Sequence, residues 1–235
     1  MNIENPENFE KKFVNEVYLD IAPHFNHSRK NPWPYVRKFV SSLKEGSILA
    51  DVGCGAGQNS VINPKVFSIS SDYNLEFAKI ANTKMQEQSY KGSVLQENNL
   101  KLSIRTNSVD HVISIAVIHH FVTDERRLQA LKELCRIIRP GGTGLITVWA
   151  FEQKNKKFTE QDNLIPWKAQ KRFLKDKNIE KKKKNEIVVY ERYYHLFVKG
   201  ELRKMFESIE NIEILSEEFD HNNWVIIFKK LENEK

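Results

Sequence analysis

Short apolar runs separated by polar segments predict the strands of this chain. The runs 48–50, 66–70 and 144–149 have strand character, and the run 110–118 is nearly continuous and rich in β-branched residues. A continuous apolar run of this kind is typical of a central strand covered on both faces. The weakly patterned segment 94–102 is a further candidate strand between them.

Apolar residues at helical spacing predict helices between these strands. Val36, Phe39, Val40 and Leu43 fall at i, i+3, i+4 and i+7, so a helix with one buried face is expected after Pro34. Two further helices are predicted over 75–85 and 123–138. Residues 1–15 are polar, and we expect either a short helix lying on the domain or a frayed end.

The region around 151–186 differs from the rest because Lys and Arg dominate it and lead into the run Lys181 to Lys184. We expect this insertion to be solvated and disordered at rest, and able to neutralise phosphates and fold when RNA binds. Structure is predicted to resume at 187–197. A short helix over 201–206 and a hairpin of the strands 212–219 and 223–229 are expected to follow.

The stretch 48–57, I-L-A-D-V-G-C-G-A-G, carries the most specific local signal. The predicted strand ends in Asp51, and Gly53, Gly55 and Gly57 then alternate with small residues. Such glycines suit a turn with positive φ that approaches a ligand closely, as in nucleotide-binding α/β folds. The G-x-G-x-G spacing differs from the G-x-G-x-x-G of dinucleotide enzymes. With Asp51 it resembles the first motif of S-adenosylmethionine-dependent methyltransferases.

Polar residues follow the next two predicted strands. Asp72 lies roughly twenty residues past the first glycine, where an acid can accept both ribose hydroxyls of an adenosyl group. An acid there can also cap the following helix. Methyltransferases usually have an acid next that meets the adenine amino group, and this chain offers Glu97, Asn98 and Asn99 there. We expect Asn98 in this role, because its amide oxygen can still accept that hydrogen bond.

Histidines and arginines gather where cofactor and substrate would meet. The central strand ends in His119 and His120, of which we expect one to be structural and His120 to face the reacting groups. Arg126 and Arg127 lie in a first helical turn, where positive charge is unfavourable, so we expect them to face an anion unless one is simply solvated. Arg29, in a segment crowded with His and Trp, suits a lid over an anionic substrate.

Composition narrows the class of protein. The 235 residues, 40% hydrophobic and 29% charged, suit one α/β domain, and a formal charge of +6 suggests a polyanionic partner. The two cysteines form neither a metal spacing nor a disulfide framework. No run approaches the roughly 20 residues of a membrane span, and no signal peptide is visible. The expectation is a soluble protein of the cytoplasm, with the nucleus as an alternative, and without a membrane partner.

Several stretches between about Tyr18 and Phe228 together identify a family. They are I-A-P-H-F-N-H-S-R with W-P, D-V-G-C-G-A-G, S-I-S-S-D, V-I-S-I-A-V-I-H-H-F with E-R-R, W-A-F-E-Q, and E-R-Y-Y-H-L-F with G-E-L. With these stretches the chain resembles the eukaryotic tRNA methyltransferases that esterify 5-carboxymethyluridine at the wobble position, a family that includes the methyltransferase domain of an AlkB homologue. Gln58 departs from the family's usual Lys, and Phe121 from its common Trp.

The resemblance implies a fold and a reaction. The fold is a class I, Rossmann-like α/β methyltransferase domain over 1–235. It has a seven-stranded, mostly parallel sheet with an antiparallel last strand, an N-terminal flap over 1–34 and the Lys-rich insertion over about 151–186. The reaction transfers a methyl group from S-adenosylmethionine to the carboxylate of 5-carboxymethyluridine, giving 5-methoxycarbonylmethyluridine. A carboxylate is already ionised near pH 7, so positioning and exclusion of water matter more than a general base.

The resemblance also implies roles for individual residues. The expected cofactor-binding residues are Asp51, Gly53, Cys54, Gly55, Gly57, Asp72, Asn98 and Ala116. Those expected at the reacting groups are Arg29, Arg126 and Arg192 as positioning groups for carboxylate or phosphate, His120, and Tyr193 and His195 for stacking on or hydrogen bonding to the flipped-out base. For the pair Tyr193 and Tyr194, strand packing is the alternative. No metal site is expected.

The partners implied are the tRNA anticodon stem-loop and a small zinc-binding activator protein, which forms a heterodimer along a sheet edge. Three other functions compete with this one. A tRNA-binding subunit without catalysis is suggested by Gln58 and Asn98, but the glycine turn and Asp72 disfavour it. A small-molecule methyltransferase is disfavoured by the basic insertion, and a nicotinamide oxidoreductase by the glycine spacing.

Overall fold

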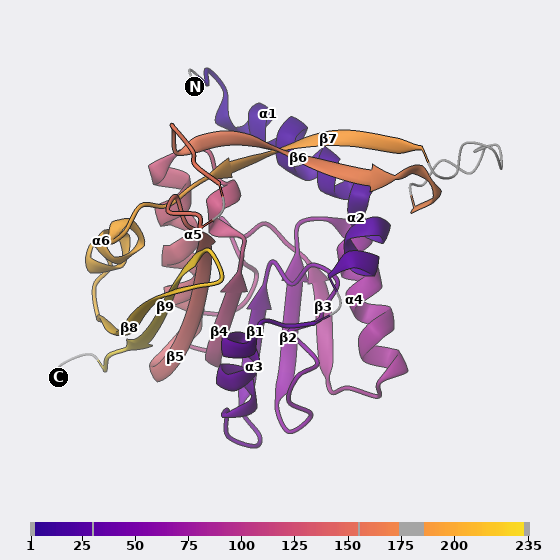
Figure 1. Cartoon of the computed structure of the whole chain (residues 1–235). Helices are drawn as coiled ribbons and strands as arrows, with labels where there is room; N and C mark the ends of the chain where they lie inside the picture. Colours follow the sequence, from indigo (N-terminus) through magenta and orange to yellow (C-terminus); the bar gives the residue numbers. More distant parts are fainter. Residues whose placement is uncertain (1–2, 30, 155, 174–185, 233–235) are drawn as a thin grey trace.

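A seven-stranded sheet forms the centre of the molecule (Figure 1). The computed structural model describes residues 3–29, 31–154, 156–173 and 186–232. The strands lie in the order β3-β2-β1-β4-β5-β9-β8. Their bounds are β1 Ile48–Val52, β2 Phe67–Asp72, β3 Gly92–Gln96, β4 Val109–Ile115, β5 Ile138–Trp149, β8 Ile212–Asp220 and β9 Asn223–Lys230.

Strand direction in this sheet agrees with the predicted fold class. Strands β1 to β5 pair in parallel, whereas β9 pairs antiparallel with both β5 and β8. Because β9 enters between β5 and β8, the predicted C-terminal hairpin closes one side of the sheet. The strand expected over 94–102 begins earlier and ends at Gln96, which leaves the two asparagines at 98 and 99 in the turn that follows.

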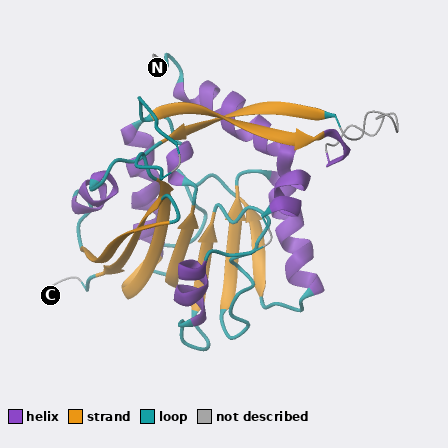
Figure 2. Ribbon diagram, in the orientation of Figure 1, coloured by secondary structure: helices purple, strands orange, loops and turns teal. Residues whose placement is uncertain are grey.

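Alternating side chains on the central strands bury both faces of the sheet. Leu49 of β1 packs toward α3 (Pro34–Ser41), and its neighbour Ala50 lies in the core on the opposite face. That second core is covered by α5 (Asp124–Ile137) and α6 (Glu201–Glu207). Figure 2 shows α3 crossing in front of the sheet. The helix α4 (Leu75–Glu87) packs beside β2 and β3.

The N-terminal segment, expected as a short helix or a frayed end, is one longer helical rod. It comprises α1 (Pro6–Glu10), a π-helical turn η1 (Lys11–Asn15) and α2 (Glu16–Ser28). Asn5 caps its start, because the Asn5 side chain accepts from the N–H of Asn8 at 3.0 Å. None of the helices in the described ranges is both long and apolar enough to cross a membrane.

Part of the basic insertion is ordered, contrary to expectation. Residues Asp162–Gln170 form β6, which pairs antiparallel with β7 (Ile187–His195) in a separate two-stranded ribbon, and a short 3-10 turn, η3 (Lys171–Phe173), follows β6. The reason is packing: Ala169 is buried against Val17 and Ile21 of α2. In Figure 1 this ribbon crosses above the main sheet, beside α1 and α2. The run Lys181 to Lys184 lies outside the described residues.

Candidate cofactor and substrate pocket

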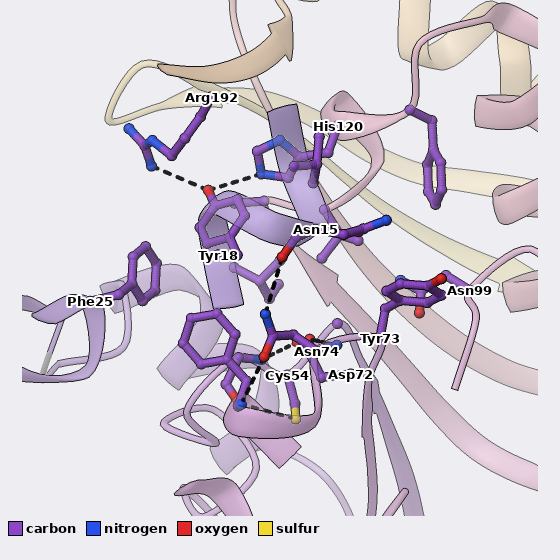
Figure 3. A pocket seen from close by; sticks show the side chains of 18 of the residues that line it. Asn15, Tyr18, Phe25, Cys54, Asp72, Tyr73, Asn74, Asn99, His120 and Arg192 are labelled. Atoms are coloured by element: carbon purple, nitrogen blue, oxygen red, sulfur yellow. Dashed lines mark hydrogen bonds between the residues drawn. The ribbon is translucent and has the colours of Figure 1, made fainter. Parts of the chain in front are cut away.

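A deep pocket lies between the carboxyl ends of the central strands and the N-terminal rod. Its floor includes the glycine turn after β1, Asp72 at the end of β2 and Ala116 after β4. The roof comes from one face of the rod, because the lining residues recur at helical spacing. They are Glu7, Glu10, Val14, Asn15, Tyr18, Phe25 and Arg29. Figure 3 shows Tyr18 and Phe25 of this roof above Cys54 and Asp72.

Three glycines shape the floor, each with positive φ. A Cβ at Gly53 would lie 2.4 Å from the Val117 side chain, and one at Gly57 would lie 2.9 Å from that of Ala81. These two glycines permit close packing beneath the turn. Gly55 has φ of 54° and nothing within 4 Å of the position that a Cβ would take, although it lines the pocket. The turn therefore offers open space in which a ligand can approach the backbone.

Asp72 fits the ribose role. Its Oδ2 accepts from the N–H of Gly55 at 2.9 Å, and its Oδ1 accepts from the N–H of Asn74 at 2.9 Å. Burial raises the pKa of Asp72 to about 6, while these two hydrogen bonds oppose the rise. Each carboxylate oxygen has two lone pairs, so acceptor capacity is left for ribose hydroxyls. The floor accordingly suits the adenosyl group of S-adenosylmethionine.

Two residues predicted to bind cofactor lie behind the floor instead. Asp51 is fully buried, its Oδ2 accepts from the hydroxyl of Ser60 at 2.5 Å, and burial raises its pKa to about 7. Asp51 and Gly57 do not line the pocket, whereas Gly53, Cys54 and Gly55 do. Ala116 also lines it, with the positive φ of 61° that is costly for a residue with a Cβ.

Asn98, the residue expected beside the adenine, lines the pocket together with Tyr73, which the sequence analysis did not single out. Both Asn98 and Asn99 line the pocket. The Oδ1 of Asn98 already accepts from the N–H of Leu100 at 2.9 Å, and Asn98 is exposed. Asn99 is only 7% exposed and lies near Tyr73, which follows Asp72 directly (Figure 3). An aromatic residue immediately after the ribose acid was a signal that could have identified Tyr73.

His119 and His120 differ in their surroundings, because His119 lies in the core and His120 lies at the pocket. His119 is fully buried, and its Nδ1 accepts from the backbone N–H of Trp149 at 3.0 Å. His120 lines the pocket, and its Nδ1 donates to the carbonyl of Tyr193 at 2.8 Å. A carbonyl only accepts, so Nδ1 carries the proton and Nε2 accepts from the hydroxyl of Tyr18 at 3.1 Å. Burial lowers the pKa of His120 to about 3, which keeps the ring neutral.

Arg192 is a buried cation without an acidic partner in the part of the chain that the structure describes. Its Nη1 donates to the hydroxyls of Tyr18 at 3.2 Å and Tyr194 at 2.8 Å, and Trp167 stacks on the guanidinium at 4.6 Å. The residue is 3% exposed and lines the pocket. Among the described residues no carboxylate pairs with it, and its Nε has no hydrogen-bond partner. Burying an unpaired charge is costly, so this position suits an anionic ligand.

Arg126 does face an anion, but one from the protein itself. Its Nε and Nη2 donate to the two carboxylate oxygens of Glu10 at 2.8 and 2.6 Å. Glu10 is 6% exposed and also accepts from the N–H of Val122 at 2.9 Å. Arg29 ends α2 at the pocket rim and is exposed, and its carbonyl accepts from the Gln58 side chain at 2.5 Å. Of the three arginines, Arg126 alone is neutralised by a carboxylate within the described chain.

Tyr193 and His195 point away from the pocket. The Tyr193 hydroxyl donates to Asp162 at 2.5 Å, and His195 lies between Asp162 and Glu201. Neither residue lines the pocket, so the structure does not bring them to a bound base as expected. The physical reason is the alternation of side chains along β7, which turns Arg192 and Tyr194 to the pocket instead. Tyr18 and Tyr194 were both missed as site residues.

The chain is similar to known proteins both in sequence and in fold. The profile of a family described as "Methyltransferase domain" matches residues 50–146. A tRNA (carboxymethyluridine(34)-5-O)-methyltransferase of Schizosaccharomyces pombe is 39% identical over 94% of this chain and 98% of its own length. The protein of the same name, alkbh8, of Xenopus tropicalis is 34% identical over 94% of this chain, which spans 41% of that relative.

Solved structures resemble this chain in fold alone. An S-adenosylmethionine-dependent methyltransferase of Clostridium acetobutylicum superposes with a TM-score of 0.67 at 12% identity, covering 97% of this chain and 100% of that one. A chain from the complex of the Trm112 methyltransferase activator with a methyltransferase of Haloferax volcanii gives 0.63 at 14% identity, over 96% and 99%. Both alignments extend beyond residues 50–146.

Proposed function

Because the chain belongs to the family of tRNA (carboxymethyluridine(34)-5-O)-methyltransferases, we propose that it methylates the carboxylate of 5-carboxymethyluridine at the wobble position of tRNA, giving 5-methoxycarbonylmethyluridine. The observation that carries the proposal is Arg192, a buried and unpaired cation on the pocket wall. A pocket that presents one such cation suits a substrate whose reacting group is an anion.

At the cofactor end, S-adenosylmethionine supplies a methyl group activated on a sulfonium. Asp72 is proposed to accept from the ribose hydroxyls, and the backbone at Gly53, Cys54 and Gly55 to lie against the cofactor. Ala116 is proposed to face it from the end of β4. Asn98 and Asn99 stand beside the adenine, together with Tyr73. Asp51 and Gly57 support the turn from behind.

At the substrate end, Arg192 is proposed to hold the carboxylate. Its Nη1 is occupied by two phenol oxygens, and Nη2 has no hydrogen-bond partner among the described residues. Tyr18 donates its own proton to the neutral His120, so its oxygen is free to accept from Arg192. This network fixes the guanidinium before the substrate arrives, which is the positioning that a reaction without a general base requires.

Exclusion of water is the second requirement. The reaction joins a cation and an anion, so charge disappears as the transition state forms and a dry site favours it. The N-terminal rod covers the pocket, and the aromatic residues of the lining offer surfaces on which an unstacked base can lie. They are Tyr18, Phe25, Trp33, Tyr73, Phe77, Phe121, Trp149 and Tyr194. Arg29, at the exposed rim, is placed for a neighbouring phosphate.

The test is incorporation of labelled methyl into tRNA that carries 5-carboxymethyluridine. We expect incorporation at position 34 by the unaltered protein, and Arg192→Met should lower kcat/KM by roughly 30-fold or more, equivalent to about 2–5 kcal/mol for loss of one partner of a buried charge pair. Arg37→Met, at an exposed position of α3, is the control and should have no effect.

A second measurement separates recognition of charge from catalysis. Unaltered protein should bind tRNA with the carboxylate more tightly than tRNA with the neutral 5-carbamoylmethyl group, and Arg192→Met should remove this difference. Retention of the preference in Arg192→Met would contradict the role of Arg192. Bound tRNA with no incorporation, with or without an activator protein, would instead favour a non-catalytic tRNA-binding subunit.

Family membership also supports the two proposed partners. We propose that the tRNA anticodon stem-loop approaches the pocket rim near Arg29, and that a small zinc-binding activator pairs along an outer strand. The outer strands of the main sheet are β3 and β8, whose free edges suit added pairing. Co-expression followed by size-exclusion chromatography tests the heterodimer, and an unchanged elution volume of this chain would contradict it.

A further inference from the structure

A second polar cluster lies beneath the ribbon, outside the pocket. His195 of β7 stands between Asp162 of β6 and Glu201 of α6. Its Nδ1 lies 2.8 Å from Asp162 Oδ1, and its Nε2 lies 2.7 Å from Glu201 Oε1. Only 7% of the His195 side chain is exposed. One imidazole therefore touches two carboxylates from two different elements.

Hydrogen-bond chemistry fixes the charge of this imidazole. An ionised carboxylate has no proton to donate, so each ring nitrogen must donate and the ring is an imidazolium. Burial lowers the pKa of His195, but the two carboxylates outweigh it and the pKa is raised overall. Burial alone would raise the pKa of Asp162, yet the hydrogen bonds from His195 and Tyr193 bring it to about 2.

The other polar groups around the imidazolium are Arg127, the buried His119 and Gln161, whose Nε2 lies 3.4 Å from Nε2 of His195. Arg127 of α5 is the nearby cation, and it lowers the pKa of His195. It is paired with Asp124 at 2.5 Å, which reduces that effect. Gln161 donates to the second oxygen of Glu201 at 2.7 Å. The cluster thus carries its own counter-charges, and the imidazolium forms its centre.

Hydrogen bonds connect this cluster with the pocket. The same Asp162 oxygen that faces His195 accepts from the Tyr193 hydroxyl at 2.5 Å. The carbonyl of Tyr193 accepts from Nδ1 of His120, and His120 holds Tyr18 beside Arg192. Tyr193 and His195 therefore hold β7 through contacts on the side away from the pocket. Their neighbours on the strand, Arg192 and Tyr194, face the pocket.

We propose that His195 is a positioning residue, a buried imidazolium that ties β6, β7 and α6 together and thereby holds Arg192 and Tyr194 at the pocket. The proposal rests on the proposed function, because it assigns His195 a task in presenting the carboxylate-binding arginine. His195 itself touches no substrate. It acts through the strand that it fixes.

The protonation state of the His195 ring can be measured without substrate. Nitrogen NMR of protein labelled at histidine should show both His195 nitrogens protonated at pH 7, where an ordinary histidine with a pKa near 6.5 is mostly neutral. Glu201→Gln removes one of the two carboxylates and should restore a titration at lower pH. An unprotonated His195 nitrogen at pH 7 in the unaltered protein would overturn the proposal, whatever the protein's activity.

The positioning role is tested by kinetics on three variants. His195→Gln and Glu201→Gln should lower kcat/KM for carboxymethyluridine tRNA by roughly tenfold to a hundredfold, as expected when a reacting group is misplaced, while cofactor affinity stays unchanged because Asp72 lies apart from the cluster. Glu207→Gln, an exposed acid on the same helix, is the matched control and should have no effect.

Dependence on pH completes the test. The raised pKa of His195 in the folded protein means that the imidazolium between Asp162 and Glu201 is present at neutral pH and is lost as pH rises through that pKa. Activity of the unaltered protein should therefore fall on the alkaline side, and activity of Glu201→Gln should begin to fall at a lower pH. Equal pH profiles, or a parallel loss of cofactor affinity, would overturn the positioning role. Absence of activity in the unaltered protein, with the imidazolium present, would instead count against the proposed function.

Discussion

Individual charged residues near the pocket differ in what neutralises them, and this decides their roles. Arg126 has a carboxylate partner on the rod, whereas Arg192 has only phenol hydroxyls and aromatic faces. The sequence identified both arginines, but it could not distinguish them, because Glu10 precedes Arg126 by 116 positions. The alternation along β7 was equally hidden, since R-Y-Y-H has no polar–apolar contrast that indicates which side chains face inward.

A pH effect on cofactor binding is expected from Asp72. Because burial raises its pKa to about 6, the carboxyl group takes up a proton as pH falls below that value and loses acceptor capacity for ribose. Affinity for S-adenosylmethionine, measured by titration calorimetry, should therefore weaken between pH 7 and pH 5. Asp72→Asn should bind weakly at all pH values and show a flat profile. Constant affinity of the unaltered protein across this range would contradict the ribose assignment.

Whole elements were predicted well where their own side chains form the core. Four of the parallel strands and the closing hairpin follow from apolar runs, whereas β3 lies in the weakly patterned segment and its bounds were wrong. The helix over 123–138 follows from apolar residues at helical spacing, and Thr123 caps its start. The strand β6 was missed because its inward residues, including Trp167 and Ala169, alternate with charged and polar ones in a Lys-rich context. Its order depends on the N-terminal rod, an element more than 130 residues away in sequence.

The rod should be held over the pocket by the pair of Glu10 and Arg126. Breaking a buried ion pair costs about 3–5 kcal/mol, and we expect less here because 26% of the Arg126 side chain is exposed. Glu10→Gln should lower the denaturation midpoint and speed cofactor release, measured by stopped-flow fluorescence. In a double-mutant cycle with Arg126→Met, additive losses would show that the two side chains do not act together.

Across the whole molecule, the excess of positive charge should govern encounter with tRNA. The chain carries 37 Lys and Arg against 31 Asp and Glu, and four of the lysines are consecutive at 181–184. Replacing these four by Ala should flatten the dependence of tRNA affinity on salt, because the slope reports roughly 0.7–0.9 per phosphate neutralised. Binding at several salt concentrations measures it. An unchanged slope would show that these lysines do not neutralise tRNA phosphates.

The pocket joins the two ends of the chain, since Tyr18 of the rod bonds Tyr194 across 176 positions. During synthesis, the glycine turn and the first five strands leave the ribosome well before β7, at roughly 5–20 residues per second. A nascent chain can thus arrange its cofactor floor while it still lacks Arg192, Tyr194 and the support of His195. On the proposed role of Arg192, we expect a product of interrupted translation that ends before β7 to leave tRNA unmodified.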